Sequence, residues 1–262
     1  MSEATSGAFN RLSIPACCCA HAGYPPSVDG MTTSIELSKP DAMTFARDGA
    51  LHIRAALHAS DLRRLEDAVA NLPPDQAGIR LYGIPALRPF LASPGAIWKL
   101  AASVLGEAAR PVRAILFDKT PSTNWGLPWH QDRTIVVTRR VEVEGFGPWT
   151  VKSGLLHVAP PFDLLAGMVT LRIHLDPVPE TNAPLLIAPG SHRLGQIPEG
   201  EVKSVVRRCG SVTCLADAGD VWLYATPILH CSEAARDPAH RRVLQVDFAA
   251  GDLPGGLTWL GI

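Results

Sequence analysis

The sequence lacks any long hydrophobic run and carries almost no net charge. Although 47% of its 262 residues are hydrophobic, no apolar stretch reaches the roughly 18 residues that a membrane-spanning helix requires. With 24 basic and 25 acidic residues, the chain has no excess of positive charge of the kind that binds nucleic acid or an anionic membrane. These absences favour a soluble, globular protein whose partner is a small molecule.

Cysteine is scarce and unevenly spaced. Three of the six cysteines are adjacent, at Cys17 to Cys19, and the others are Cys209, Cys214 and Cys231. This distribution does not suit a disulfide framework, and neither the adjacent cysteines nor the Cys209 and Cys214 pair has the spacing of a zinc site. Reduced thiols in the cytoplasm fit the sequence best.

Residues 1–30 have no hydrophobic periodicity and are rich in Ser, Ala, Pro and Gly. A secretion signal is not favoured, because Glu3 precedes the apolar stretch over 12–20 and that stretch contains a proline. We expect residues 1–30 to be disordered or a wrongly assigned extension, with Met31 as the true start. Residues 31–262 then form a single domain.

Three segments near the N-terminus predict helices. The first spans 40–48 and stops at Gly49. The second follows Ser60 as its N-cap, and the third follows Ser93 and Pro94 and ends at Gly106. The second and third have apolar residues at helical spacing, and all three are expected to be scaffold.

From residue 111 onward the pattern changes to short strands separated by turn residues, which is typical of an antiparallel sandwich or barrel. Besides an outer strand at 50–53, we expect strands at 112–119, 134–137, 168–176, 185–188, 212–216, 221–225, 228–231 and 242–249. Eight strands in two packed sheets form a jelly roll. The predicted fold is therefore mostly β with N-terminal helices: a double-stranded β-helix of the cupin-like kind.

Alternation along the last strand predicts which of its faces lines a site. Side chains on a strand point alternately to opposite sides. One side carries Leu244, Val246 and Phe248, and the other carries Arg241, Val243, Gln245 and Asp247. The first set is expected to pack on the helices. The second set is a poor core surface but suits a barrel interior that holds a polar ligand.

His130 and Asp132 are two residues apart, so on a strand their side chains project to the same side. His230 supplies a second imidazole a hundred positions later. Two neutral imidazoles and one carboxylate, with coordination positions left open, form the ligand set of non-haem Fe(II) that activates dioxygen. Each residue alone could be an ordinary loop or core residue, but together they predict an iron site.

The ordered set of motifs over residues 41–250 resembles the phytanoyl-CoA dioxygenase family of Fe(II)/2-oxoglutarate-dependent oxygenases. The motifs are Phe117-Asp118-Lys119-Thr120-Pro121, Trp129-His130-Gln131-Asp132, Leu171-Arg172-Ile173-His174-Leu175-Asp176, Pro189-Gly190-Ser191-His192, Gly219-Asp220, and His230 with Arg241. The resemblance implies a double-stranded β-helix and iron bound by His130, Asp132 and His230. It also implies 2-oxoglutarate anchored by Arg241, with Ser232 beside its far carboxylate.

The resemblance further implies a reaction. Members of the family use dioxygen to convert 2-oxoglutarate into succinate and carbon dioxide while a substrate is hydroxylated. A planar, permanently charged guanidinium such as that of Arg241 suits the distal carboxylate in a dry pocket. Asp132 argues against a halogenase, in which a small residue replaces the carboxylate ligand. Hydroxylation of a small organic substrate is the expected outcome.

Further candidates follow from strand parity. Arg172 shares a face with His174, and the two form either part of the cosubstrate or substrate pocket or a structural pair. Lys119 shares a face with Arg113 and either meets an anion or extends along the strand to solvent. Five more residues are open between site and scaffold, namely Trp125, Trp129, Trp149, His157 and His192.

Two other functions remain open from the residues alone. A cupin-like metal-dependent isomerase or hydrolase would use the His/Asp/His site as a Lewis acid without a cosubstrate, and it would not need Arg241. A non-catalytic barrel would bind a ligand without redox chemistry. The segment 177–184 lacks the Asn-Gly turn that is common in the family, so a stiffer loop there is expected to affect substrate choice.

Overall fold

The helices and strands of the computed structural model lie within residues 37–73 and 76–262, which are the residues it describes. The helices are α1 (Lys39–Asp48), α2 (Ala59–Val69), α3 (Arg88–Leu91), α4 (Ala96–Leu105), α5 (Phe162–Ala166) and α6 (Val202–Cys209). The strands are β1 (Ala50–Ile53), β2 (Gly78–Leu81), β3 (Arg110–Lys119), β4 (Leu127–His130), β5 (Ile135–Val136), β6 (Trp149–Lys152), β7 (Leu155–Val158), β8 (Val169–His174), β9 (Leu185–Ile187), β10 (Val212–Cys214), β11 (Val221–Ala225), β12 (His230–Ser232) and β13 (Arg241–Ala249). The expectations for residues 1–30 and Met31 lie outside this range.

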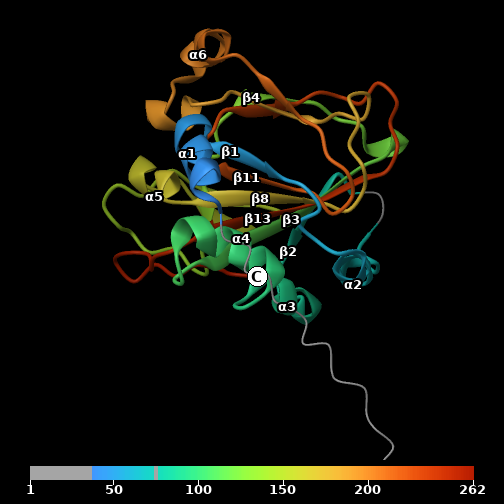
Figure 1. The fold of residues 1–262 in the computed structure, drawn as a ribbon. Coiled ribbons are helices and arrows are strands. Elements are labelled where there is room, and N and C mark those ends of the chain that lie inside the picture. Colours follow the sequence, from blue (N-terminus) through green and yellow to red (C-terminus); the bar gives the residue numbers. More distant parts are fainter. Residues whose placement is uncertain (1–36, 74–75) are drawn as a thin grey trace, which may run out of the picture. The chain divides into compact units, whose positions relative to one another are not determined.

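The strands form three antiparallel sheets. A six-stranded sheet has the order β1-β11-β8-β13-β3-β2, a four-stranded sheet has the order β10-β9-β12-β4, and a three-stranded sheet has the order β5-β7-β6. Helices α2, α3 and α4 lie on one side of the six-stranded sheet, and β4 of the four-stranded sheet lies on the other (Figure 1). The mostly β character and the N-terminal helices are as predicted. In the described residues, however, the strands form separate sheets and no closed barrel.

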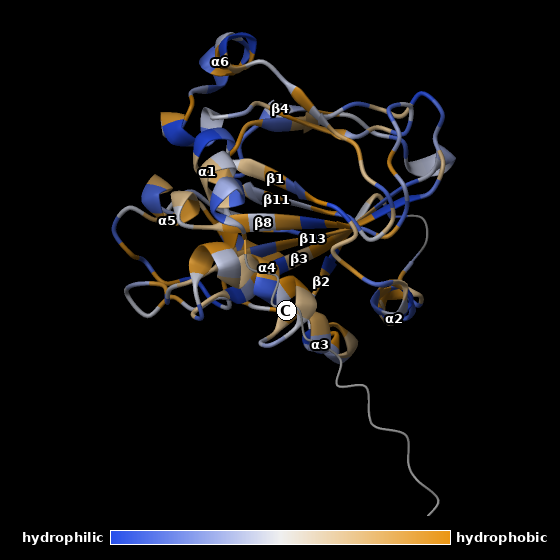
Figure 2. Ribbon diagram, in the orientation of Figure 1, coloured by the Kyte–Doolittle hydropathy of each residue, from blue (hydrophilic) through white to orange (hydrophobic). Residues whose placement is uncertain are grey.

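The hydrophobic core lies between the six-stranded sheet and the N-terminal helices. Leu244, Val246 and Phe248 of β13 are fully buried in it together with Leu65 of α2 and Ile97 of α4. Figure 2 shows the strands of this sheet with extensive hydrophobic colouring. The parity prediction for this strand is confirmed, because the apolar residues face the helices and leave the opposite face of β13 for a site.

Two predicted helix starts were wrong by a few residues. Helix α2 begins at Ala59 with His58 in the N-cap position, so Ser60 lies inside the helix. Helix α4 begins at Ala96 after Gly95. A Cβ atom at Gly95 would lie 2.3 Å from the carbonyl oxygen of Phe90, which means that only glycine allows this close approach of the chain.

Several short elements had no counterpart in the prediction. These are β2, β4, β6, β7, α3, α5 and α6. Strand β6 has three exposed residues out of four, so it has little hydrophobic alternation to reveal it. The strand expected at 134–137 is reduced to Ile135–Val136. The last strand begins at Arg241 and not at residue 242.

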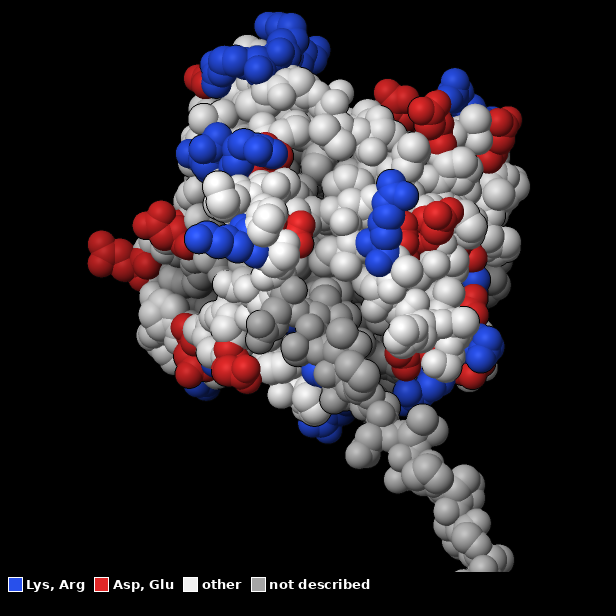
Figure 3. Space-filling view, in the orientation of Figure 1, with Lys and Arg blue, Asp and Glu red and all other residues white. Residues whose placement is uncertain are grey.

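Two surface properties of the described residues bear on possible partners. None of their helices combines the length and hydrophobicity needed to cross a membrane. Figure 3 shows Lys and Arg side chains gathered over α6, with charges of both signs over the rest of that face.

Candidate active site

A cavity of about 740 Å³ opens between the sheets, a volume within the usual range for small-molecule sites. Its lining includes His130, Asp132 and His230, along with Arg172, Ser232 and Arg241. Six of the seven residues predicted for the site therefore line one cavity. The seventh, Lys119, is fully buried beside it and hydrogen-bonds to Ser232.

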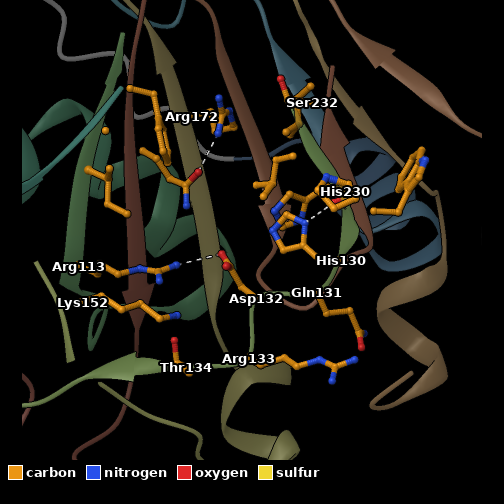
Figure 4. Close-up of a pocket in the computed structure, with 18 of the residues that line it drawn as sticks. Arg113, His130, Gln131, Asp132, Arg133, Thr134, Lys152, Arg172, His230 and Ser232 are labelled. Atoms are coloured by element: carbon orange, nitrogen blue, oxygen red, sulfur yellow. Dashed lines mark hydrogen bonds and ion pairs between the residues drawn. The ribbon is translucent and has the colours of Figure 1, made fainter. Parts of the chain in front are cut away.

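Two of the three candidate metal ligands come from neighbouring strands of the four-stranded sheet, and the third follows one of these strands. His130 ends β4 and pairs directly with His230 at the start of β12. Asp132 follows two residues after β4, and its carboxylate lies between Arg113 and the two imidazoles (Figure 4). One ligand atom from each residue lies within 4.8 Å of the other two. The arrangement can hold one metal ion.

Each histidine is held by the backbone carbonyl two residues before it. The Nδ1 of His130 donates to the carbonyl of Pro128 at 2.8 Å, and the Nδ1 of His230 donates to the carbonyl of Ile228 at 2.9 Å. Because Nδ1 carries the proton, Nε2 keeps its lone pair for a metal. Burial together with the neighbouring His130 lowers the pKa of His230 to about 4, which keeps that imidazole neutral. This donor set fits iron.

Arg113 holds the carboxylate of Asp132 in place. Its Nη2 donates to Asp132 at 2.9 Å, and its Nε donates to Asp247. Burial alone would raise the pKa of Asp132, but Arg113 and the two imidazoles outweigh it and lower that pKa to about 2. Burial instead raises the pKa of Asp247, which sits beside the charge of Asp132. Asp132 is therefore ionised and oriented for a metal.

A second group of charges, Arg241, Lys119 and Arg172, lies at one end of the cavity. Arg241 and Lys119 are directly paired on β13 and β3, and their exposed fractions are 2% and 0%. Arg172 donates to the side chain of Gln245 at 2.8 Å. Within residues 37–73 and 76–262, none of the three cations forms an ion pair with a carboxylate. Buried cations without counter-charges are costly, so this end of the cavity is suited to an anion.

The surroundings of Arg241 show how it is held. One of its terminal nitrogens donates to the carbonyl of Ala183, whereas its buried Nε has no partner. Burial and the neighbouring Arg172 lower the pKa of Arg241 to about 9, so it is charged at neutral pH. The hydroxyl of Ser232 lies 3.0 Å from Nζ of Lys119 and also contacts Ala183. The segment 177–184, which departs from the family pattern, therefore supports the anion end of the cavity.

The remaining candidates divide between the cavity and the scaffold. The cavity lining includes Trp125, Trp129 and His157. Trp149 instead packs against a separate core cluster, and Cys231 points away from the cavity and lines a shallow depression beside α6. His174 is buried with both ring nitrogens unpaired, and burial followed by the nearby arginines lowers its pKa to about 3.

Gln131 is a functional position that sequence reasoning passed over. Its buried amide donates to the carbonyls of Pro227 and Gly195 and accepts from the backbone N–H of Ile197. These bonds fix the segment that carries His130 and Asp132. The only signal was its place between two predicted ligands, because its partners are distant in sequence and become neighbours only in the fold.

The family model for phytanoyl-CoA dioxygenase matches residues 45–243, which include all of the candidate ligands and Arg241. The chain belongs to the phytanoyl-CoA dioxygenase family. This bears out the resemblance inferred from the motifs. Comparison with curated proteins finds no match.

Solved structures share the fold at low sequence identity. EctD from S. alaskensis with 2-oxoglutarate and 5-hydroxyectoine has a TM-score of 0.62 and 20% identity, covering 86% of this chain and 81% of that chain. The alpha ketoglutarate dependent carbocyclase SnoK from nogalamycin biosynthesis has a TM-score of 0.60 and 19% identity, covering 88% and 90%. The epimerase SnoN from the same biosynthesis has a TM-score of 0.57 and 18% identity, covering 82% and 88%.

Family membership and the three clustered ligand side chains agree with the prediction of an iron- and 2-oxoglutarate-dependent oxygenase. That class, with its metal and cosubstrate, is confirmed. The reaction outcome, the substrate and the roles of individual residues stay predictions.

Proposed function

We propose that this enzyme hydroxylates a small organic substrate, consuming dioxygen and 2-oxoglutarate and releasing succinate and carbon dioxide. His130, Asp132 and His230 would bind the iron. When bound, the iron would supply the activation of dioxygen that is coupled to decarboxylation of the cosubstrate. The chain itself orients the two imidazoles, holds Asp132 ionised through Arg113, and provides a charged end for the cosubstrate.

The observation that carries the proposal is a cluster of three cations at one end of the cavity that also holds the three ligand side chains. Arg241 and Arg172 line the cavity and Lys119 is buried beside it, and in the described residues none of the three is paired with a carboxylate. A keto acid that chelates the metal at one end needs its other carboxylate neutralised inside the protein. Arg241 is suited to that role, because guanidinium binds a carboxylate through two parallel hydrogen bonds. Ser232 and Lys119 would add one donor and one charge.

The same cluster weighs against metal-dependent isomerase or hydrolase chemistry without a cosubstrate. A Lewis-acid site polarises its substrate at the metal, so it does not require three buried cations that have no acidic partner in the described residues. Hydroxylation is proposed as the outcome because Asp132 supplies a carboxylate ligand, which leaves no ligand position for a halide.

The proposal is tested by anaerobic ultraviolet–visible titration of the protein with Fe(II) and then with 2-oxoglutarate. We expect a weak visible charge-transfer band that requires both additions and is absent from His130→Ala. Arg241→Gln should need at least about tenfold more cosubstrate, since one charge-assisted hydrogen bond contributes about 1.5–3 kcal/mol.

Arg242→Gln is the matched control. Arg242 is the next residue on the same strand but faces the other way and pairs with Asp176 and Glu66, so its loss should leave cosubstrate affinity unchanged. A protein that binds Fe(II) but never develops the band would contradict the proposal. With a substrate in hand, a mass gain of one oxygen atom would separate hydroxylation from ring closure or epimerisation.

A further inference from the structure

The cavity extends past the candidate metal ligands to a second set of basic side chains. In Figure 4, Lys152 and Arg133 lie on the far side of Asp132 from Arg172 and Ser232. Arg80 also lines the cavity and is paired with Ile115 across β2 and β3, so the two side chains share the cavity face. The cavity therefore has basic groups at both ends, with the metal ligands between them.

Among the residues that the structure describes, Arg80 and Lys152 have no acidic partner. Within the described parts of the chain, neither side chain has a carboxylate oxygen within 4.0 Å. Within residues 37–73 and 76–262, Arg80 donates to the hydroxyl of Ser153 at 2.9 Å, and its buried Nε has no partner there. Burial and the neighbouring Arg113 lower the pKa of Arg80, so the charge is held where it is electrostatically unfavourable. An anion placed there would relieve this cost.

His157 adds a hydrogen-bond donor to the same end. It is 1% exposed, and its Nε2 has no partner among the described residues. The hydroxyl of Thr134 lies 3.4 Å from Nδ1, which places the single imidazole hydrogen on Nε2 when that hydroxyl donates. Burial, followed by Lys152 and Arg113, lowers the pKa of His157 to about 4. The neutral ring is therefore a donor that can serve an anion.

The acidic side chains of the cavity do not balance these groups. Only Asp132 and Glu199 contribute carboxylates to the lining in the described residues. Asp132 is already bound by Arg113, and Glu199 is 92% exposed at the rim and 3.9 Å from Arg133. The excess of positive charge is local, since the whole chain has a net charge of −1.

We propose that the substrate carries an anionic group, a carboxylate or a phosphate, which binds Arg80, Lys152 and His157 at the end of the cavity away from Arg241. This inference rests on the proposed function and names its substrate class. Arg241 would take the cosubstrate and the outer set would take the substrate, so that the two anions enter opposite ends and the metal lies between them. Apolar side chains in the lining, including Leu127, Trp129, Leu185 and Val202, would contact the uncharged remainder of the substrate.

The test uses benzoate and phenyl phosphate as anionic probes and benzamide as a neutral probe of similar shape. Their binding is measured calorimetrically on the full chain under nitrogen, with Fe(II) and saturating 2-oxoglutarate present to fill the inner end. We expect the wild-type protein to bind at least one anion about tenfold more tightly than benzamide. The Arg80→Gln/Lys152→Gln double variant should lose that preference.

The matched control is Arg139→Gln/Lys203→Gln, which removes two exposed basic residues outside the cavity lining and should keep the preference. If the double variant folds poorly, Lys152→Glu tests the same site, because Lys152 is exposed and its substitution should not disturb folding. This variant should weaken anion binding at least as strongly as the double variant. Which anion binds more tightly distinguishes a carboxylate from a phosphate substrate.

Two outcomes would overturn the inference: no preference for anions in the wild-type protein, or a preference that survives in both the double variant and Lys152→Glu. Neither outcome affects the charge-transfer band, which reports the proposed function separately. Loss of the band with anion binding still dependent on Arg80 and Lys152 would instead overturn the oxygenase proposal alone.

Discussion

Lys119 shows how one buried side chain can make a binding site sensitive to pH. Burial, reinforced by Arg241 and Arg172, lowers its pKa to about 7, so it is partly deprotonated at neutral pH in the ligand-free protein. A carboxylate bound beside Arg241 would favour the ammonium form and raise that pKa. Binding of 2-oxoglutarate is then coupled to uptake of a proton.

We therefore expect the affinity for 2-oxoglutarate to fall as the pH rises above about 7, approaching about tenfold per pH unit for full one-proton coupling. Calorimetric titration of the metal-loaded protein between pH 6.5 and 8.5 measures it. Lys119→Met should bind with a smaller pH dependence, because no ammonium remains to be gained. If the affinity changed equally with pH in wild type and variant, the pH dependence would come from another group.

The sign for stability is opposite to that for binding. The folded-state pKa of Lys119 lies below the unfolded value of about 10.4, which means that the unfolded chain binds more protons between these two values. The ligand-free protein should accordingly gain stability from this residue as the pH rises from about 7 toward 10. A residue that costs stability when protonated is more easily explained as part of a binding site than as scaffold.

At the level of elements, Arg113 connects strands of two different sheets. It lies on β3 of the six-stranded sheet, is paired with Asp247 on β13, and reaches Asp132 just after β4 of the four-stranded sheet. Substituting Arg113→Gln should weaken metal binding about 10- to 100-fold, as is usual when a group that orients a ligand is lost. Metal titration with competition from a chelator measures the change.

Arg113 also neutralises buried Asp247, so a second variant separates the two roles. Arg113→Gln/Asp247→Asn removes the stranded charge and should recover the unfolding temperature without recovering metal affinity. Arg110→Gln, on the same strand but in an exposed pair with Asp252, should leave metal binding unchanged. If the double variant recovered full metal affinity, Arg113 would affect metal binding only by neutralising Asp247.

The elements predicted correctly from the sequence are those with one buried face, because burial fixes the positions of their apolar residues. Strand β13 alternates between Leu244, Val246 and Phe248 on the core side and polar residues on the cavity side, and this parity correctly placed Arg241 in the cavity. Strand β6 is largely exposed and β2 is only four residues long, so neither has a periodicity that stands out. Arg80 and Lys152 are on these two strands, which is why the outer basic group was not foreseen.

The candidate ligands were predictable for another reason. His130, Asp132 and His230 were identified by residue type and spacing, which the chain shows directly, whereas the role of Arg241 was implied by the resemblance to the family. Their support was not predictable, because the bonds of Gln131 and Arg113 join segments far apart in sequence. Hydrogen bonds of this kind depend on which loops the fold brings together.

At the scale of the whole molecule, the site consists of residues from both main sheets. The candidate metal ligands belong to the four-stranded sheet and its loop, whereas Arg241 belongs to β13 of the six-stranded sheet. A cosubstrate that contacts both the metal and Arg241 would connect the two sheets. Its binding energy then adds to the stability of the folded protein, because the unfolded chain has no such site.

We expect 2-oxoglutarate at about 100 times its dissociation constant to stabilise the Fe(II)-loaded protein by about 2.7 kcal/mol, which corresponds to a rise of about 5–10 °C in unfolding temperature for a domain of this size. Differential scanning calorimetry under nitrogen measures the rise. The rise should be small in the metal-free protein and at most about half as large in Arg241→Gln at the same concentration, since each lacks one of the two attachment points. Arg242→Gln should keep the full increment. An equal increment in Arg241→Gln would mean that the cosubstrate does not bridge the sheets through this residue, and the anion end of the cavity would then need a different ligand.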